Sequence, residues 1–375
     1  MSDIPRFWYR RGAVSLFFLP LAALFTAASF CRRTLYRYGI LRVWRAPVPV
    51  VVVGNLALGG SGKTPVVQAL VRALQAHDIA VGVVSRGYGG SAVEATDVAA
   101  CPDATVVGDE PLLLWQTTGA PVVVGRKRAA AAQKLLHNYP ATQLLLADDG
   151  LQHYALARDV EIVVIAADLG LGNGFLLPAG PLREPAARLA RADVVLSADP
   201  ARYPHPHSYP LRYTSDGVRP LAGGGMRPPA ALEAPLYALT AIARPERFFA
   251  GLRAQGATLA ACHALPDHAA LPASATAFAT GGSLIISSKD AVKTAAWPAA
   301  LRQRTYVADY RARLPPELLP WLLRRLGFAD RQDGSQPAGS EIRPSSAWHH
   351  ASSTGSTSPT KARNTPAADS TPVSG

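Results

Sequence analysis

A run of β-branched residues that passes directly into a glycine-rich turn constrains the fold of this chain more than any other feature. PVPVVVVGN, residues 47–55, predicts a short buried strand. GGSGKTP, residues 59–65, comes next and opens a helical pattern that extends to about Gln75. Glycines allow backbone amides to turn towards a phosphate group, and the N-terminus of the next helix adds partial positive charge. This order of strand, loop and helix predicts a P-loop nucleotide-binding domain.

The glycine-rich turn also predicts which residues hold the nucleotide. Lys63 is placed to reach the β- and γ-phosphates, and the Thr64 hydroxyl to bind Mg²⁺. The usual pattern has glycine where this chain has Ala57, and we interpret the extra glycines as relieving the turn instead. A glycine-rich loop without a nucleotide is the alternative, which the strand–loop–helix context disfavours. The predicted ATP-binding residues are Ala57, Leu58, Gly59, Gly60, Ser61, Gly62, Lys63 and Thr64.

Apolar runs alternate with helical segments along the rest of the chain. This alternation predicts an α/β fold whose mostly parallel sheet is covered on both faces. A second, smaller αβ stretch begins near Leu236. The runs that predict strands are 81–85, 121–125, 142–150, 160–168 and 193–199, and then 236–242, 256–262 and 283–288.

Composition predicts five parts. The region around 215–235 is rich in glycine and proline, which suggests a linker, and the C-terminal residues contain few large apolar groups, which predicts disorder. The predicted parts are a membrane-anchoring segment (1–46), a P-loop kinase core (47–220), a linker (221–235), a C-terminal αβ lobe (236–330) and a disordered tail (331–375).

Residues 13–31, AVSLFFLPLAALFTAASFC, carry no charged side chain. As a helix, a segment of this length reaches roughly 28 Å, close to the hydrocarbon thickness of a bilayer. Arginines flank it, with more on the C-terminal side, which favours a cytoplasmic location for the chain after residue 32. We therefore predict a membrane helix rather than a cleaved signal peptide or a buried core helix. Pro20 leaves open whether it spans the bilayer or lies in its surface.

The distribution of charge favours a membrane partner over nucleic acid. The formal charge of the chain is +12, and residues 1–46 hold eight arginines against one aspartate, which gives +7. Basic side chains around an apolar segment are suited to an anionic membrane surface. The three cysteines have no paired spacing, which excludes a disulfide framework and a zinc pattern.

Two adjacent carboxylates end the apolar run LLLADDG, residues 144–150. P-loop enzymes place the carboxylate that holds Mg²⁺, or its water shell, at the end of such a strand. The side chains of Asp148 and Asp149 point to opposite sides of an extended strand, so only one needs to face the metal. Thr64, Asp148 and Asp149 are the predicted Mg²⁺ ligands, and which aspartate faces the ion stays open.

VVGDEP, residues 106–111, offers a carboxylate for proton transfer. Asp109 is a candidate general base, because a hydroxyl that attacks a phosphoryl group gains from a carboxylate that orients it. The alternative is that Asp109 caps a helix whose first turn contains Pro111. His268 in LPDHAAL is a candidate partner for a carboxylate, although a lone histidine is more often structural.

Two arginines lie after predicted strand ends or in rigid turns. Arg86 lies in SRGYGG, where a guanidinium can meet phosphate charge and glycines permit close approach. Arg183 lies next to Glu184 in PAGPLREP. Either arginine is a candidate for binding substrate or phosphate, or else forms a structural ion pair.

These motifs, in this order, resemble the tetraacyldisaccharide 4′-kinases of lipid A biosynthesis. The resemblance extends from about residue 36 to 328, and that family commonly lacks glycine at the position of Ala57. SSKDAVK, residues 287–293, departs from the family, which usually has Thr-Glu before the Lys-Asp pair, and we assign it no role. The matching pieces are VPVVVVGN, GGSGKTP, SRGYGG, VGDEP, DDGLQH, LLPAGPLREP, ARPERFF and PDH.

The resemblance implies a reaction and a location. Members of the family use ATP and Mg²⁺ to phosphorylate the 4′-hydroxyl of a tetraacylated glucosamine disaccharide 1-phosphate at the cytoplasmic face of the bacterial inner membrane. By position, Asp109 matches the proposed catalytic base of the family, and His268 matches the histidine thought to assist it. The resemblance implies a lipid substrate and a membrane surface as partners, without nucleic acid or an obligate protein partner.

Two other classes of protein are the alternatives. A membrane-recruited GTPase should show an Asn-Lys-x-Asp signature, and the nearest string, Ser-Lys-Asp at 288–290, has the wrong spacing. An ATPase that delivers a metal or cofactor should carry a cluster of Cys or His ligands, which this sequence lacks. Acyl-chain preference and oligomeric state stay open.

Overall fold

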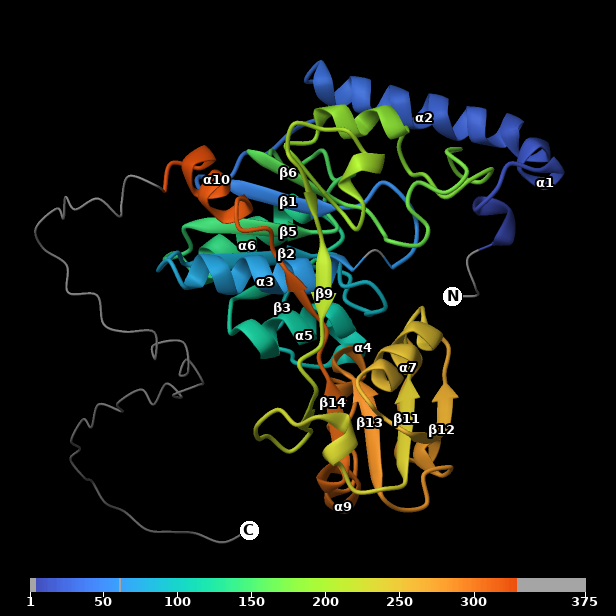
Figure 1. Ribbon diagram of the computed structural model, residues 1–375. Coiled ribbons are helices and arrows are strands. Elements are labelled where there is room, and N and C mark those ends of the chain that lie inside the picture. The colour runs from blue at the N-terminus through green and yellow to red at the C-terminus, as the bar shows by residue number, and fades with distance from the viewer. Residues whose placement is uncertain (1–4, 61, 329–375) are drawn as a thin grey trace, which may run out of the picture. The chain divides into compact units, whose positions relative to one another are not determined.

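The computed structural model of the chain describes residues 5–60 and 62–328 (Figure 1). The predicted tail over 331–375 and the predicted nucleotide-binding residue Ser61 lie outside the described residues. The described chain forms two large sheets and one two-stranded sheet.

The first sheet has eight strands in the order β3-β4-β2-β5-β1-β6-β7-β8. All neighbouring strands run parallel except β3, which is antiparallel to β4. This confirms the predicted mostly parallel α/β sheet. The strands are β1 Val50–Gly54, β2 Val81–Ser85, β3 Thr96–Asp97, β4 Val122–Val124, β5 Leu144–Asp148, β6 Val160–Val164, β7 Val194–Ser197 and β8 Ser208–Pro210.

Both faces of this sheet are covered by helices. Because side chains alternate along each strand, neighbouring residues of one strand enter two different cores. Val51 and Val53 of β1 join a core with α3 (Lys63–Gln75), α5 (Asp109–Thr118) and α10 (Leu318–Arg325), while Val50 and Val52 join a core with α6 (Arg128–Asn138). Full burial of a side chain such as valine contributes about 1.5–3 kcal/mol. The continuous apolar runs in the sequence are the consequence of this double covering.

The second sheet has five strands in the order β10-β14-β13-β11-β12, and only β10 is antiparallel to its neighbour (Figure 1). Its strands are β10 Val218–Pro220, β11 Leu236–Thr240, β12 Leu259–Ala264, β13 Ser283–Ser287 and β14 Thr305–Ala308. The shorter helices are α4 Ala104–Val107, α7 Pro245–Ala254, α8 Ser288–Ala291 and α9 Ala299–Gln303. The 3₁₀ turns are η1 Arg6–Trp8, η2 Ala186–Arg191, η3 Pro200–Arg202, η4 Pro229–Ala231 and η5 Ala273–Thr276.

After β14 the chain returns to the first sheet. β9 (Arg212–Thr214) pairs antiparallel with β15 (Arg311–Arg313), and Leu318, Leu322 and Phe328 join the same core as α3. The predicted division into five parts stays a prediction. Residues 311–328, which it assigned to the C-terminal lobe, pack with the first sheet.

The expected membrane helix over 13–31 is two helices instead. α1 (Ala13–Phe17) and α2 (Leu19–Arg37) are separated by Phe18, which caps both, and Pro20 lies in the first turn of α2. Only residues 19–31 of α2 precede its first arginine, and such a segment reaches about 20 Å. No helix within 5–60 or 62–328 has the length and apolar character that crossing a bilayer requires. The spanning form of the prediction is therefore not supported.

Candidate active site

The glycine-rich loop leaves the end of β1, in the middle of the first sheet, and α3 begins at Lys63. Gly62 has a φ of +78°, which side-chain-bearing residues rarely adopt, and a Cβ there would lie 2.2 Å from the Tyr213 hydroxyl. The Tyr213 hydroxyl donates to the Gly62 carbonyl at 3.1 Å. Gly62 is therefore required by the turn, and the Tyr213 side chain would also have to move to admit a Cβ there.

The first residues of the loop are used for internal pairing. The Ala57 amide donates to Asn55 Oδ1 at 3.0 Å, and the Leu58 amide donates to the Pro181 carbonyl at 2.8 Å. Both amides are occupied within the protein, and the Leu58 bond joins the loop to the PLREP segment that carries Arg183. The assignment of Ala57 and Leu58 to the nucleotide stays a prediction.

Asp149 lies between two cations. Lys63 Nζ is 3.3 Å from its Oδ1, and Arg183 Nη1 is 3.2 Å from its Oδ2. Burial opposes ionisation, but Lys63 and Arg183 lower the pKa of Asp149 well below its usual range. The structure thus brings together three residues that the sequence singled out in separate motifs, and Arg183 pairs with Asp149 rather than with Glu184.

Asp148 differs from its neighbour because no cation among the described residues forms an ion pair with its carboxylate. Its side chain is buried, Oδ1 has no hydrogen-bond partner, and Oδ2 accepts only a long 3.5 Å bond from Ser85. Burial raises the pKa of Asp148 to about 7, and the nearby Glu110 carboxylate adds to the shift. A buried carboxylate with an unpaired oxygen fits a site for a cation.

Thr64 connects the loop to α5. Its hydroxyl donates to Glu110 Oε2 at 3.2 Å. Within 5–60 and 62–328, no group of three or more His, Cys, Asp or Glu residues could hold a metal ion unaided. Mg²⁺ usually binds through one or two carboxylates together with substrate phosphates, so the pair Thr64 and Asp148 fits an ion brought by a nucleotide.

Asp109 does not cap the helix that it begins. The N-cap of α5 is Gly108, and no side chain makes a capping hydrogen bond there. The Asp109 carboxylate turns to the second sheet instead, where Oδ2 is 3.2 Å from His268 Nδ1 and 2.9 Å from Lys293 Nζ. Burial opposes ionisation, but these two hydrogen bonds lower the pKa of Asp109, which is therefore ionised.

His268 is held in a strained conformation. Its φ is +63°, a left-handed value that costs a non-glycine residue of order 1–3 kcal/mol. Its ring packs edge-on against Tyr88 of the SRGYGG loop at 5.1 Å, and Lys289 Nζ is 3.1 Å from its Nε2. Such strain persists only where the surrounding contacts over-determine the conformation, as these do.

The SRGYGG loop also packs against the segment that carries Asp109. Gly108 has a φ of +90°, and a Cβ there would lie 2.6 Å from the Tyr88 carbonyl oxygen. The two glycine-containing motifs are therefore interdependent. Arg86 is exposed at the carboxyl end of β2. Burial lowers the pKa of Arg128 and of His153, and the positive charge of Arg86 lowers both further.

Three residues at the site were not predicted from the sequence. They are Glu110 on the Thr64 hydroxyl, Lys289 on His268 and Lys293 on Asp109. The available signal was SSKDAVK, whose two lysines are four residues apart at the end of a strand. The sequence departs from the family there, and no role was assigned.

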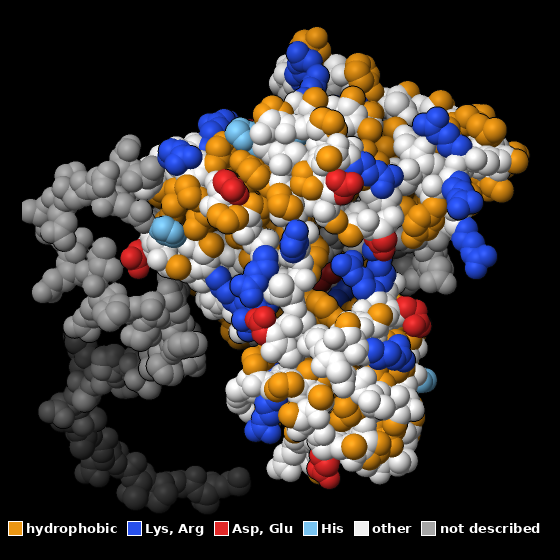
Figure 2. Space-filling view, viewed as in Figure 1, with side chains coloured by type: hydrophobic (Ala, Val, Ile, Leu, Met, Phe, Trp, Pro, Cys, Tyr) orange, Lys and Arg blue, Asp and Glu red, His pale blue; other side chains and the backbone are white. Residues whose placement is uncertain are grey.

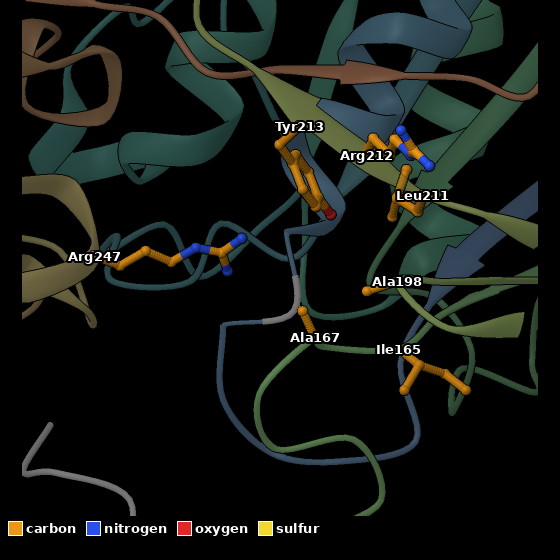
Figure 3. Close-up of a pocket in the computed structure, with 7 residues that line it drawn as sticks. All are labelled: Ile165, Ala167, Ala198, Leu211, Arg212, Tyr213 and Arg247. Atoms are coloured by element: carbon orange, nitrogen blue, oxygen red, sulfur yellow. The ribbon is translucent and has the colours of Figure 1, made fainter. Parts of the chain in front are cut away.

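A cavity of about 270 Å³ opens beside the glycine-rich loop. Figure 3 shows the Tyr213 ring and the Arg247 side chain on one side of it, with Ile165 and Ala198 on the other. Arg247 lies 5.9 Å from the centre of the Tyr213 ring. The lining residues are Ile165, Ala167, Ala198, Leu211, Arg212, Tyr213 and Arg247.

The sequence of this chain matches a known protein family. A family model described as tetraacyldisaccharide-1-P 4′-kinase matches residues 14–327. The tetraacyldisaccharide 4′-kinase of Dichelobacter nodosus is 44% identical over 326 residues, 86% of this chain and 97% of that protein. That of Chromobacterium violaceum is 45% identical over 348 residues, 87% of this chain and 98% of that protein.

A solved structure shares the fold. The crystal structure of the "apo" form of LpxK from Aquifex aeolicus in complex with ATP has a TM-score of 0.71 and 24% sequence identity. The match covers 84% of this chain and 99% of that chain.

Proposed function

The chain belongs to the tetraacyldisaccharide-1-phosphate 4′-kinase family, and from this premise we propose that its site transfers the γ-phosphoryl group of ATP to the 4′-hydroxyl of a tetraacylated disaccharide 1-phosphate. The product is the 1,4′-bisphosphorylated precursor of lipid A. The hydroxyl oxygen attacks the γ-phosphorus, the bond to the β–γ bridging oxygen breaks, ADP leaves and the hydroxyl proton passes to a base.

One observation carries this assignment. The Thr64 hydroxyl of the glycine-rich loop is hydrogen-bonded to Glu110, the neighbour of Asp109, at 3.2 Å. The nucleotide loop and the ionised Asp109 therefore share one local structure. A phosphate in the loop and a hydroxyl on Asp109 can meet at the short distance that phosphoryl transfer requires.

The nucleotide is proposed to bind along the carboxyl edge of the first sheet. Gly59, Gly60 and Gly62 present the loop, Lys63 reaches the β- and γ-phosphates, and Arg183 adds charge beside Asp149. The cavity lined by Tyr213 and Arg247 adjoins Gly62 and suits the nucleoside, since an aromatic ring and a guanidinium can both stack on a base. Arg86, exposed at the next strand end, is proposed to attract the anionic acceptor.

Mg²⁺ is proposed to be held by Thr64 and Asp148, with Asp149 turned to Lys63 and Arg183. The unpaired Asp148 Oδ1 is the observation that supports this choice between the two aspartates. When bound, the ion supplies charge that stabilises the transferring phosphoryl group.

Isosteric amides separate the roles of the two aspartates. Asp148→Asn is expected to raise the Mg²⁺ concentration for half-maximal rate by about 10–100-fold, because an amide is a weaker Mg²⁺ ligand. Asp149→Asn should change that concentration less, because its side chain serves Lys63 and Arg183. Mg²⁺ titrations of both variants at saturating ATP check this. The opposite ranking would assign the ligand to Asp149.

Membrane attachment is proposed to occur through the surface of α1 and α2 rather than by a span. Apolar side chains on these helices are exposed, among them Phe17 at 78%, Leu24 at 67% and Phe30 at 62%. Figure 2 shows hydrophobic and basic side chains together over this region. An apolar face bordered by arginines is typical of helices that lie in the surface of an anionic bilayer. We therefore place the enzyme at the cytoplasmic face of the inner membrane.

Substitution of the exposed apolar side chains tests the attachment better than truncation. Removal of residues 1–31 would also remove the Trp8 bond to the Pro178 carbonyl and the Asn173 bonds to Phe7 and Ser15. We expect the triple variant Phe17→Ser, Leu24→Ser, Phe30→Ser to lose most of its binding to vesicles with anionic lipid, at about 0.8 kcal/mol per buried CH₂. Vesicle sedimentation measures this. Replacement of Val93, which is 76% exposed outside these helices, is the matched control, and unchanged sedimentation of the triple variant would refute the proposal.

The activity is tested by incubating the purified protein with γ-labelled ATP, Mg²⁺ and the tetraacylated disaccharide 1-phosphate. Label should appear in the lipid at the 4′ position, and ATP turnover should depend on the acceptor. A 4′-deoxy acceptor should receive none. Label that stays in inorganic phosphate whether or not lipid is present would favour an ATPase and overturn the assignment.

A further inference from the structure

The two lysines of SSKDAVK approach the Asp109–His268 pair from the second sheet. Lys289 Nζ lies 3.1 Å from His268 Nε2, and Lys293 Nζ lies 2.9 Å from Asp109 Oδ2. An ammonium group near each member of the pair restricts which atoms can carry protons. The motif begins at the end of β13 and continues into α8.

Hydrogen-bond chemistry decides the proton positions. An ammonium group has three donors and no acceptor, so Nε2 must accept from Lys289. A neutral imidazole that accepts at one nitrogen carries its proton on the other, so Nδ1–H donates to Asp109 Oδ2. The contact therefore selects the Nδ1–H tautomer of His268. In this tautomer neither ring nitrogen is free to take a proton from Asp109.

The two oxygens of Asp109 are consequently unequal. His268 and Lys293 both donate to Oδ2, and among the described residues no hydrogen bond falls on Oδ1. Oδ2 is fully occupied, and its position is fixed by two donors from the second sheet. Oδ1 is the oxygen left to receive a substrate hydroxyl.

We propose that Lys289 is a positioning residue that fixes His268 as the Nδ1–H tautomer, so that Asp109 Oδ2 is anchored and Oδ1 is the oxygen that orients the acceptor hydroxyl and takes its proton. The proposal rests on the proposed function, in which Asp109 is the base. It adds that His268 is a donor to the base throughout the reaction rather than a proton acceptor.

The surroundings hold Lys289 where this requires. Its Nζ also contacts Asp267 Oδ1 at 3.2 Å and Glu110 Oε1 at 3.4 Å. Burial opposes its charge, but these carboxylates raise the pKa of Lys289, so the ammonium form persists. α8 itself is anchored by the fully buried Asp290, which accepts from the Thr240 and Ser287 hydroxyls at 2.7 and 2.6 Å.

The tautomer is measured by ¹⁵N NMR of histidine-labelled protein without substrate. His268→Gln identifies the signals of His268 among the nine histidines of the chain. We expect a protonated Nδ1 and an unprotonated Nε2 near neutral pH. Lys289→Met removes the donor, and the Nε2–H tautomer should then appear. Because no turnover is involved, this result is independent of whether the proposed kinase reaction is correct.

Kinetics with three substitutions at Lys289 complete the test. Lys289→Met should lower kcat by about 10–100-fold with little change in KM for ATP, because the base is misplaced while the nucleotide site is intact. Lys289→Arg, a donor without an acceptor, should restore the Nδ1–H tautomer and part of the rate. Lys289→Gln offers both a donor and an acceptor, so it should restore the Nδ1–H tautomer only in part. Lys134→Met, on an exposed lysine that donates to the Ala95 carbonyl, is the control.

Three outcomes would overturn the proposal. The first is an Nε2–H tautomer in the wild-type protein, a measurement that needs no variant to fold. The second is the same tautomer in wild type and Lys289→Met, despite a lower rate. The third is a Lys289→Gln variant with the Nδ1–H tautomer but the rate of Lys289→Met, which would assign Lys289 to electrostatic contact with substrate.

Discussion

Lys63→Ala is expected to abolish label transfer to the lipid while the protein stays folded. Lys63 begins α3 beside Gly62, and its ammonium is the cation nearest to where the β- and γ-phosphates lie in a P-loop. Phosphoryl transfer depends on stabilising charge on the transferring group, so removal of this cation should lower kcat by at least about 10²–10³-fold. Thr64→Ala should fall comparably, because it removes a proposed Mg²⁺ ligand.

Matched variants separate chemistry from folding. Thr64→Ser keeps the hydroxyl that donates to Glu110 and should retain much of the activity. Lys63→Ala leaves Asp149 paired with Arg183, so the thermal unfolding temperature of this variant should change little. Near-normal turnover in either alanine variant would rule out the nucleotide site as assigned.

The strands of the first sheet were predictable because they are buried on both faces. A strand of that kind consists of continuous apolar residues, and β2, Val81–Ser85, coincides with the predicted run. Strands at the edge and between the sheets gave no such signal. The residues of β9, Arg212–Thr214, are polar, and their side chains are exposed or half-buried. The position of β9 is set by its pairing with β15, almost a hundred residues later.

The N-terminal helix was mispredicted for a local reason. An uncharged segment of the right length favours one continuous helix, but length and polarity do not register the backbone break at Phe18. Proline at the second position of α2 is favourable, because the amide that it lacks has no partner in a first helical turn. Pro20, which the sequence analysis interpreted as a possible break in one helix, lies instead in the first turn of a second helix.

Local sequence patterns could predict that Lys63 and Asp149 lie close together, but not that Asp109 and His268 do, and the reason is physical. Lys63 and Asp149 come from motifs at the ends of neighbouring strands, β1 and β5, and parallel strands bring their carboxyl ends to one edge. Asp109 and His268 are 159 residues apart and meet across two sheets. Local spacing could not decide whether Asp109 is a helix cap or a general base, because a residue in either role can lie at the start of a helix.

Asp109→Asn is expected to lower kcat by about 10²–10⁴-fold while ATP still binds, since general-base catalysis contributes on that order. A sugar hydroxyl is a poor nucleophile, and in a loose transition state its proton leaves late, so the base mainly orients it. Asparagine caps helices as well as aspartate does, and a pure cap would tolerate the change. Steady-state kinetics with the lipid acceptor measure the loss, and a kcat near wild type would refute the role.

His268→Ala should cost less than Asp109→Asn, because it removes a support of the base rather than the base. The double variant should cost less than the product of the two separate losses, since residues that act as a unit are not additive. Fully additive losses would count against a functional pair.

The buried ammonium of Lys293 determines how the Asp109→Asn result must be controlled. Its side chain is 7% exposed, and the amide leaves it with Asp290 at 3.7 Å and the Ala269 carbonyl as remaining partners. Loss of one member of a buried ion pair costs about 3–5 kcal/mol of unfolding free energy, so part of any loss in activity reflects stability. The double variant Asp109→Asn, Lys293→Met removes the unpaired charge and should recover much of that stability. If Asp109 is the base, its kcat stays as low as that of Asp109→Asn. A return of kcat together with stability would show that Asp109 serves the fold and not the reaction.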